Sequence, residues 1–123
     1  MNSLIFDEFK DFKDSQYMAV RTECSGGMYF GVYAKKQYLT RFNDIASCSV
    51  KVSGKTANVI RFNINDTSFC FVNAHLHEGK TPVDATKRQA MVKEIASKAF
   101  KAEREFRYKN YDILEGHDVK VIS

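Results

Sequence analysis

Two apolar segments joined by a very short polar turn constrain the fold of this chain more than any other feature. The segments are Thr56–Ile64 and Ser68–Ala74, and both are rich in β-branched and aromatic side chains. Between them lies Asn65-Asp66, two residues that tolerate the positive φ angle of a tight hairpin. The sequence therefore predicts an antiparallel β-hairpin in the middle of the chain.

Further strands and helices follow from hydrophobic periodicity and turn residues. The sequence predicts strands at Gln16–Thr22, Met28–Ala34, Ile45–Val52 and His117–Ile122. It predicts helical segments at Asn2–Lys13 and Lys35–Phe42, and a long helix from Pro82 to about Arg104. Strands followed by a long helix and another strand indicate an α/β fold, a mixed β-sheet with flanking helices.

The long helix has the clearest start signal in the chain. Thr81 suits the N-cap, Pro82 the first helical position, and Asp84 the third position of a capping box. We expect its buried stripe to contain Val83, Met91, Val92, Ile95, Ala99 and Phe106. Lysine and arginine side chains should face outward.

The positive charge of the chain is concentrated in one segment. The net charge is +4, and residues 80–109 hold nine Lys or Arg against four Asp or Glu. Such a segment suits a phosphorylated ligand, a nucleic acid or an acidic membrane surface, or is simply the solvated side of a helix. Glu94, Glu103 and Glu105 interrupt it, which argues against nucleic acid.

The sequence also bears on the compartment. Asp7, Glu8, Asp11 and Asp14 near the N-terminus argue against a secretory or transit peptide, and no transmembrane segment is expected. Cys24, Cys48 and Cys70 are widely spaced and form no CxxC pair, so we expect buried reduced thiols. These features predict an intracellular protein, cytoplasmic or membrane-peripheral.

The residues that suit phosphate chemistry lie at the end of the hairpin. Asn73 and His75 are separated by one residue, which places both side chains on one side of the strand. A histidine can donate a hydrogen bond to a phosphate oxygen while the asparagine orients it. A metal site at His75 and His77 lacks an evident third ligand. Ser53-Gly54-Lys55-Thr56 leads into a strand, unlike a phosphate-binding P-loop.

The hairpin contains a specific pattern, which consists of Arg61-Phe62, the run from Thr67 to Asn73, and His75-Leu76. This pattern resembles the inositol-polyphosphate 5-phosphatases, including the synaptojanin-like members, of the endonuclease/exonuclease/phosphatase superfamily. Weaker similarities occur at 28–36, at Lys87-Arg88-Gln89 and at His117-Asp118-Val119. The resemblance implies a single partial 5-phosphatase-like domain over 1–123, equivalent to part of the four-layer α/β sandwich of that superfamily.

The resemblance also implies which catalytic parts should be present. Family members use Mg²⁺-assisted attack of water on a 5-phosphate. The metal-binding Glu, the Asp and Asn of a G-D-L-N motif and the S-D-H motif have no counterpart here, and the glycine-rich loop is shortened at 53–59. We therefore expect no cofactor in this chain, His75 and Asn73 as the remaining catalytic residues, and Lys80 and Arg88 as substrate contacts.

Two interpretations account for this reduced set. The chain is either a piece of a larger enzyme, or a reduced and non-catalytic descendant acting as an interaction or structural subunit. The Met1 start, the compact strand set and the lost loop glycines favour the second. We expect no turnover by the isolated chain, and phosphoinositide or inositol-phosphate recognition as the most that it retains. The rival hypothesis is a scaffold role in a larger assembly, with no ligand at all. Half of a two-sheet fold should also expose an apolar sheet face, so we expect a protein partner or self-association to cover it.

Overall fold

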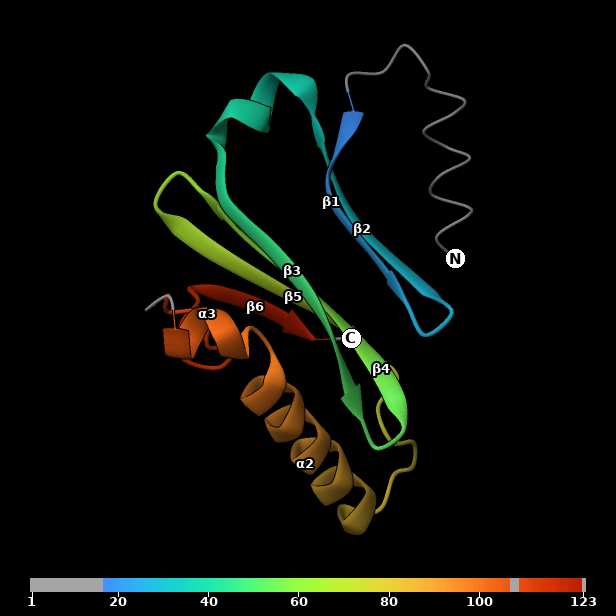
Figure 1. Cartoon of the computed structure of the whole chain (residues 1–123). Helices are drawn as coiled ribbons and strands as arrows, with labels where there is room; N and C mark the ends of the chain where they lie inside the picture. Colours follow the sequence, from blue (N-terminus) through green and yellow to red (C-terminus); the bar gives the residue numbers. More distant parts are fainter. Residues whose placement is uncertain (1–16, 107–108, 123) are drawn as a thin grey trace.

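A computed structural model describes residues 17–106 and 109–122. In these residues a two-stranded sheet is formed by β1 (Tyr17–Ser25) and β2 (Met28–Lys35), and a four-stranded sheet has the order β3-β4-β5-β6. The strands of the larger sheet are β3 (Phe42–Val52), β4 (Lys55–Ile64), β5 (Thr67–Ala74) and β6 (Val119–Ile122). Figure 1 shows α2 (Pro82–Lys98) and α3 (Lys101–Phe106) against this sheet, with the β1–β2 hairpin set apart from them. The expected helix at Asn2–Lys13 lies outside the described residues.

The central hairpin is confirmed. β4 and β5 pair antiparallel from Ala57–Ala74 to Ile64–Thr67. Asn65 has a φ of 53°, the left-handed conformation that the tight turn requires. The prediction was reliable because strand propensity and turn chemistry act within this one short segment.

β1 extends to Ser25, three residues beyond the expected end, and two strands begin more than one residue from the expected position. β3 begins at Phe42 rather than Ile45, because a bulge between Asn43 and Ala46 lets the strand continue past Asp44, whose φ is 52°. β6 begins at Val119, because Asp118 accepts hydrogen bonds from the Ser68 backbone N–H (2.9 Å) and hydroxyl (3.2 Å) instead of joining the ladder. β6 pairs parallel to β5.

The prediction of one helix from Pro82 to about Arg104 was wrong. The helix ends at Lys98, and Phe100 has a φ of 54° before α3 begins. This break turns the Phe100 ring inward, where it is 2% exposed and packs edge-on against Tyr111 at 5.3 Å. Val83 and Phe106, expected in the buried stripe, are 64% and 75% exposed. The actual buried face consists of Met91, Ile95, Ala96, Ala99 and Phe100.

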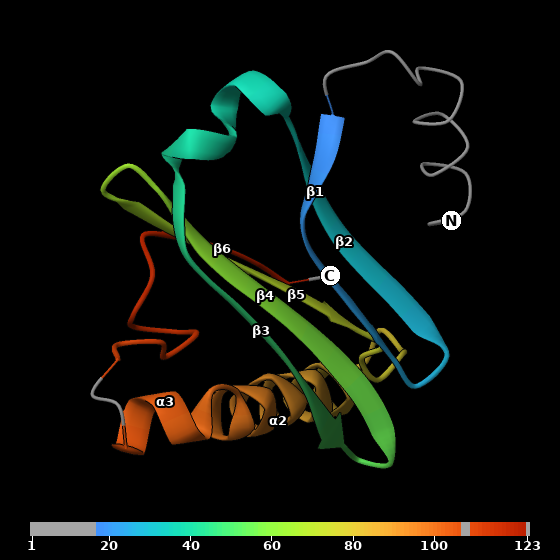
Figure 2. The same cartoon turned by 45° about the horizontal axis from the view of Figure 1, so that its top comes forward.

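Strand β4 lies at the centre of the fold and is covered on both faces. On one face Ala57 and Val59 pack in the core cluster with Met91 and Ile95 of α2. On the other face Ile60 is fully buried, and the β1–β2 hairpin approaches β3 through a hydrogen bond from the Ser49 hydroxyl to Glu23 (3.1 Å). Figure 2 shows the two-stranded hairpin and α2 on opposite sides of the larger sheet.

The exposed apolar sheet face is smaller than expected, because the β1–β2 hairpin covers part of it. Side chains alternate along a strand, so Val119 and Val121 of β6 lie on the face away from α2. They are 38% and 45% exposed. Phe69 and Phe71 share this face, with ring centroids 6.5 Å apart.

The cysteines fit the expectation of reduced thiols, but not of uniform burial. All three are free, and Cys24 is exposed. Burial raises the pKa of Cys48 to about 11 and that of Cys70 to about 12, so both stay protonated at neutral pH. Across the part of the chain that is described, no helix combines the length and apolar character needed to cross a bilayer.

Candidate functional site

Three segments meet at one end of the larger sheet. They are the turn at Ser53-Gly54 between β3 and β4, the loop over 75–81 that follows β5, and the first half of α2. Because β4 and β5 run antiparallel with Ala57 opposite Ala74, the start of β4 lies beside the end of β5. The residues predicted for phosphate chemistry lie in or next to these segments.

Asn73 is the second-last residue of β5, and His75 is the first residue after the strand. Asn73 is half-buried and lies directly opposite Asn58 in the ladder. The His75 side chain is 63% exposed, and its Nε2 lies 3.5 Å from Oε1 of Glu78. An exposed imidazole beside a half-buried amide is accessible to a ligand at this edge of the sheet.

Lys80 and Arg88, the other predicted contacts, differ in their surroundings. Lys80 is exposed in the loop. Arg88 is half-buried on α2, and its Nη1 donates to the backbone carbonyls of His77 (3.2 Å) and Gly79 (2.6 Å). Arg88 therefore links the loop that follows His75 to α2. Its predicted contact with substrate stays a prediction.

A second set of contacts fixes the same loop to the start of α2. Thr81 and Asp84 form the predicted capping box, with the Thr81 hydroxyl accepting from the Asp84 N–H (3.2 Å). Asp84 also lies 2.7 Å from Nε2 of His77. The hydrogen bond from the Thr81 side chain, followed by that from His77, lowers the pKa of Asp84 to about 2. Any side chain at Gly79, whose φ is 125°, would collide with Asp84.

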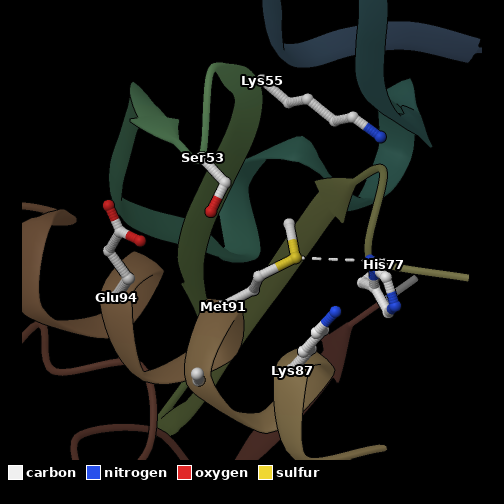
Figure 3. Close-up of a pocket in the computed structure, with 7 residues that line it drawn as sticks. Ser53, Lys55, His77, Lys87, Met91 and Glu94 are labelled. Carbon is white, nitrogen blue, oxygen red and sulfur yellow. Dashed lines mark hydrogen bonds between the residues drawn. The ribbon is translucent and has the colours of Figure 1, made fainter. Parts of the chain in front are cut away.

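A pocket of about 350 Å³ lies between the β3–β4 turn, the loop and α2 (Figure 3). Met91 and Ala90 supply its apolar surface. The Met91 sulfur accepts from the His77 backbone N–H at 3.3 Å. The polar lining is formed by Ser53, Lys55, His77, Lys87 and Glu94. Sequence reasoning did not bring Lys55 and Lys87 together, since only the fold places the β3–β4 turn beside α2.

The described residues lend no support to a metal site at His75 and His77. Over 17–106 and 109–122, no group of three or more His, Cys, Asp or Glu side chains is arranged to hold one. His75 and His77 thus have no third ligand in that part of the chain, and Asp84 already engages His77. No step through Mg²⁺ is assigned to these residues.

Sequence reasoning also missed a buried polar network at the opposite end of β4. Arg61 is 2% exposed and lies under the Tyr111 ring at 4.3 Å. It donates to Nε2 of His117 (3.0 Å) and pairs with Asp44 at 3.0 Å. A charged residue within an apolar strand was the available signal, because such a group must find partners when buried.

A family model described as endonuclease/exonuclease/phosphatase family 2 matches residues 2–121. Type IV inositol polyphosphate 5-phosphatase 3 of Arabidopsis thaliana is 46% identical over 44 residues, which are 36% of this chain and 7% of that protein.

Similarity also extends to solved structures. The inositol polyphosphate 5-phosphatase domain of SpSynaptojanin, in complex with inositol (1,4)-bisphosphate and calcium ion, superposes with a TM-score of 0.64 and 25% identity, covering 86% of this chain and 30% of that one. A Cimex nitrophorin, as its ferrous NO complex, has a TM-score of 0.50 at 17% identity over 68% of this chain and 31% of that one, which indicates the fold alone.

The sequence and the fold agree on one family. The matched region runs through nearly the whole chain, and the mixed sheet with flanking helices corresponds to part of the 5-phosphatase domain. The chain spans less than a third of the synaptojanin domain and less than a tenth of the plant enzyme. This protein belongs to the endonuclease/exonuclease/phosphatase family 2 and is similar to its inositol polyphosphate 5-phosphatases.

Proposed function

We propose that this chain binds a phosphate group of an inositol phosphate or phosphoinositide at the end of β5 and does not hydrolyse it unaided. The observation that supports this most is the placement of Asn73 and His75 at that strand end, in a chain whose solved relative holds inositol (1,4)-bisphosphate. The exposed imidazole, the Asn73 amide and the Lys80 ammonium are three groups that can donate hydrogen bonds to phosphate oxygens.

Hydrolysis needs more than these donors. Attack on a phosphate monoester requires an oriented water and compensation of the charge that develops on the phosphoryl oxygens. His75 and Asn73 can stabilise that charge, but no cluster of three or more His, Cys, Asp or Glu side chains is arranged among the described residues to hold a metal ion that would activate the water. Binding without turnover is the function that these side chains support.

The setting of the ligand is part of the proposal. Lys80 and the lysines of α2 would attract either a free inositol phosphate or a headgroup at a membrane surface. We place the protein inside the cell, where both occur, in the cytoplasm or at the membrane periphery. Mg²⁺ would not be required for the binding step.

Calorimetric titration with inositol 1,4-bisphosphate tests the binding. His75→Ala should weaken it about tenfold, as expected for the loss of one hydrogen bond to a charged group. Gln37→Ala, an exposed change in the 3-10 helix η1 (Lys36–Arg41), is the control. Equal affinities for the two variants would contradict the proposed site.

A phosphate-release assay with Mg²⁺ and with EDTA tests the absence of turnover. We expect equal release under the two conditions. Metal-dependent release that His75→Ala abolishes would show that the chain is an enzyme.

A second candidate function is that of a structural subunit. It rests on the exposed Val119 and Val121 beside Phe69 and Phe71, an apolar strip at the edge of the sheet. Sedimentation equilibrium of the wild type and of Val121→Asp checks it. Association that the substitution abolishes would favour this role, and a monomer at all concentrations would argue against self-association.

A further inference from the structure

The side-chain amide of Asn58 is buried without a partner for its nitrogen. Asn58 lies in the central strand β4 and is 0% exposed. Among the residues that the structure describes, its Nδ2 is the one buried side-chain nitrogen or oxygen that has no hydrogen-bond partner. A buried N–H group without an acceptor is energetically costly, and this cost disappears when an acceptor reaches it. The burial of Asn58 therefore favours any movement of a neighbour that brings an acceptor to Nδ2.

Asn58 lies at the centre of a polar row that crosses the larger sheet. The Ser49 hydroxyl of β3 shares its proton between Oδ1 of Asn58 (2.5 Å) and Oε1 of Glu23 (3.1 Å). In the ladders, Asn58 pairs with Ser49 on one side and with Asn73 of β5 on the other. Since the oxygen of the Asn58 amide is bonded to Ser49, the neighbour in this row that remains for the nitrogen is Asn73.

The Asn73 side chain is within reach of Asn58 and is not engaged elsewhere. Residues directly opposite each other in an antiparallel pair have Cβ atoms about 4.5–5.5 Å apart. Asn73 is half-buried, and its amide forms no hydrogen bond with the side chains or backbone of the described residues. Asn73 can therefore turn its oxygen towards Asn58 without breaking an existing contact.

The two ends of the Asn73 amide have different chemistry. Its nitrogen donates two hydrogen bonds and its oxygen only accepts, so a phosphate can be bound by the nitrogen alone. When Nδ2 of Asn73 points at a phosphate oxygen, Oδ1 must point away from the ligand. A donor on the side of β4 is what this orientation requires, and Asn58 has one without a partner.

We propose that Asn58 is a positioning residue of the phosphate site, whose Nδ2 donates to Oδ1 of Asn73 while Nδ2 of Asn73 donates to the bound phosphate. The inference rests on the proposed function and deepens it, because it names the residue that orients the Asn73 amide. Asn58 is fully buried and does not touch the ligand itself. Phosphate binding is thereby coupled to the pairing of a buried donor in the centre of the sheet.

Calorimetric titration of the whole chain with inositol 1,4-bisphosphate tests this coupling through a double-mutant cycle. Asn58→Leu should weaken binding about threefold to tenfold, as expected for the net loss of one neutral hydrogen bond. In the Asn73→Ala background the same substitution should have almost no further effect, because the pair is already broken. Ile60→Leu is the matched control, since Ile60 is fully buried two residues along β4 and the change conserves volume; its affinity should stay within about twofold of the wild type.

Stability in the absence of ligand distinguishes positioning from a structural role. Leucine removes the unpaired donor, and the Ser49 hydroxyl keeps Glu23 as its acceptor. The urea midpoint of Asn58→Leu should therefore equal that of the wild type or exceed it. A lowered midpoint, together with an equal loss of affinity in the wild-type and Asn73→Ala backgrounds, would mean that Asn58 acts only through the fold and would overturn the proposal.

Nuclear magnetic resonance of the isotope-labelled chain tests the same contact without a substitution at Asn58. Saturation with inositol 1,4-bisphosphate should shift one side-chain amide proton of Asn58 downfield, as a new hydrogen bond does, and Asn73→Ala should abolish this shift. An Asn58 amide that the ligand leaves unmoved would overturn the positioning role.

The outcomes also separate this inference from the proposed function. If Asn73→Ala and His75→Ala weaken binding but Asn58→Leu does not, the positioning role fails and the phosphate site stands. If the wild type does not bind the bisphosphate, or if neither Asn73→Ala nor His75→Ala changes its affinity, the proposed function fails.

Discussion

Replacing Arg61 by methionine should destabilise this fold severely while leaving the shape of the side chain nearly intact. Arg61 is 2% exposed in the central strand β4. Its guanidinium pairs with Asp44 at 3.0 Å, donates to His117 at 3.0 Å and to Asn63 at 2.7 Å, and lies 4.3 Å from the Tyr111 ring centroid. Methionine fills similar space but satisfies none of these acceptors.

The size of the effect follows from the burial of the partners. Breaking a fully buried ion pair from one side costs about 3–5 kcal/mol. Asp44 is 32% exposed and can regain water, so we expect about 3 kcal/mol, at the lower end of that range. With a urea slope of about 1–3 kcal/mol per molar, the unfolding midpoint should fall by about 1–3 M.

Urea unfolding followed by circular dichroism measures this loss. Arg41→Met is the matched control, because Arg41 is exposed and its guanidinium lies 5.3 Å from the centroid of the Tyr38 ring. Its free energy of unfolding should change by less than about 0.5 kcal/mol. A loss below about 1 kcal/mol for Arg61→Met would refute the argument that the polar network is needed to hold the charged side chain in the core.

Three further predictions concern packing and pH. Ile95→Ala should lower the free energy of unfolding by about 2–5 kcal/mol, because Ile95 is 2% exposed in the core. Val83→Ala in the same helix should change it little, because Val83 is 64% exposed; thermal and urea unfolding measure the stability of both variants. The pKa of Asp84 is lowered from 3.8 to about 2, so the stability that it contributes is complete above about pH 4 and lost as the pH falls towards 2. Asp84→Asn should flatten the curve of unfolding free energy against pH between these values. An unchanged curve would contradict the role of the Thr81 and His77 contacts. Burial lowers the pKa of His117 below 6.5, and its Nε2 accepts a hydrogen bond from Arg61. The unfolded chain therefore takes up a proton first as the pH falls below about 6.5, and the free energy of unfolding decreases there. His117→Gln, which keeps an acceptor, should reduce this dependence of stability on pH, measured as the urea midpoint against pH.

Local chemistry explains which parts of the fold were predicted well. The central hairpin depends on strand-forming residues and on Asn65 at positive φ, and the start of α2 depends on Thr81 and Asp84. Each of these features is decided within a few residues. The helix break at Phe100 is different, because the conformation that interrupts the helix is stabilised by a buried contact with Tyr111, eleven residues later in the chain.

The same distinction between local sequence and tertiary contacts applies to the candidate site. Asn73 and His75 were identified from their spacing at a strand end, which is a property of the sequence. The engagement of Arg88 with the carbonyls of His77 and Gly79 was not, since it depends on how α2 lies against the loop. That contact gives Arg88 a role in shaping the loop, while its predicted ligand contact stays a prediction.

The sequence by itself determined the family of this protein, its central hairpin and the strand end where phosphate chemistry is expected, because these reside in short contiguous patterns. Tertiary structure alone decided what surrounds them. Lys55 and Lys87 face one pocket only because β3, β4 and α2 pack together. Arg61 can be buried only because Asp44 and His117 reach it from 17 and 56 residues away. Burial and charge pairing are sums over neighbours in space, and the linear order of residues does not specify those neighbours.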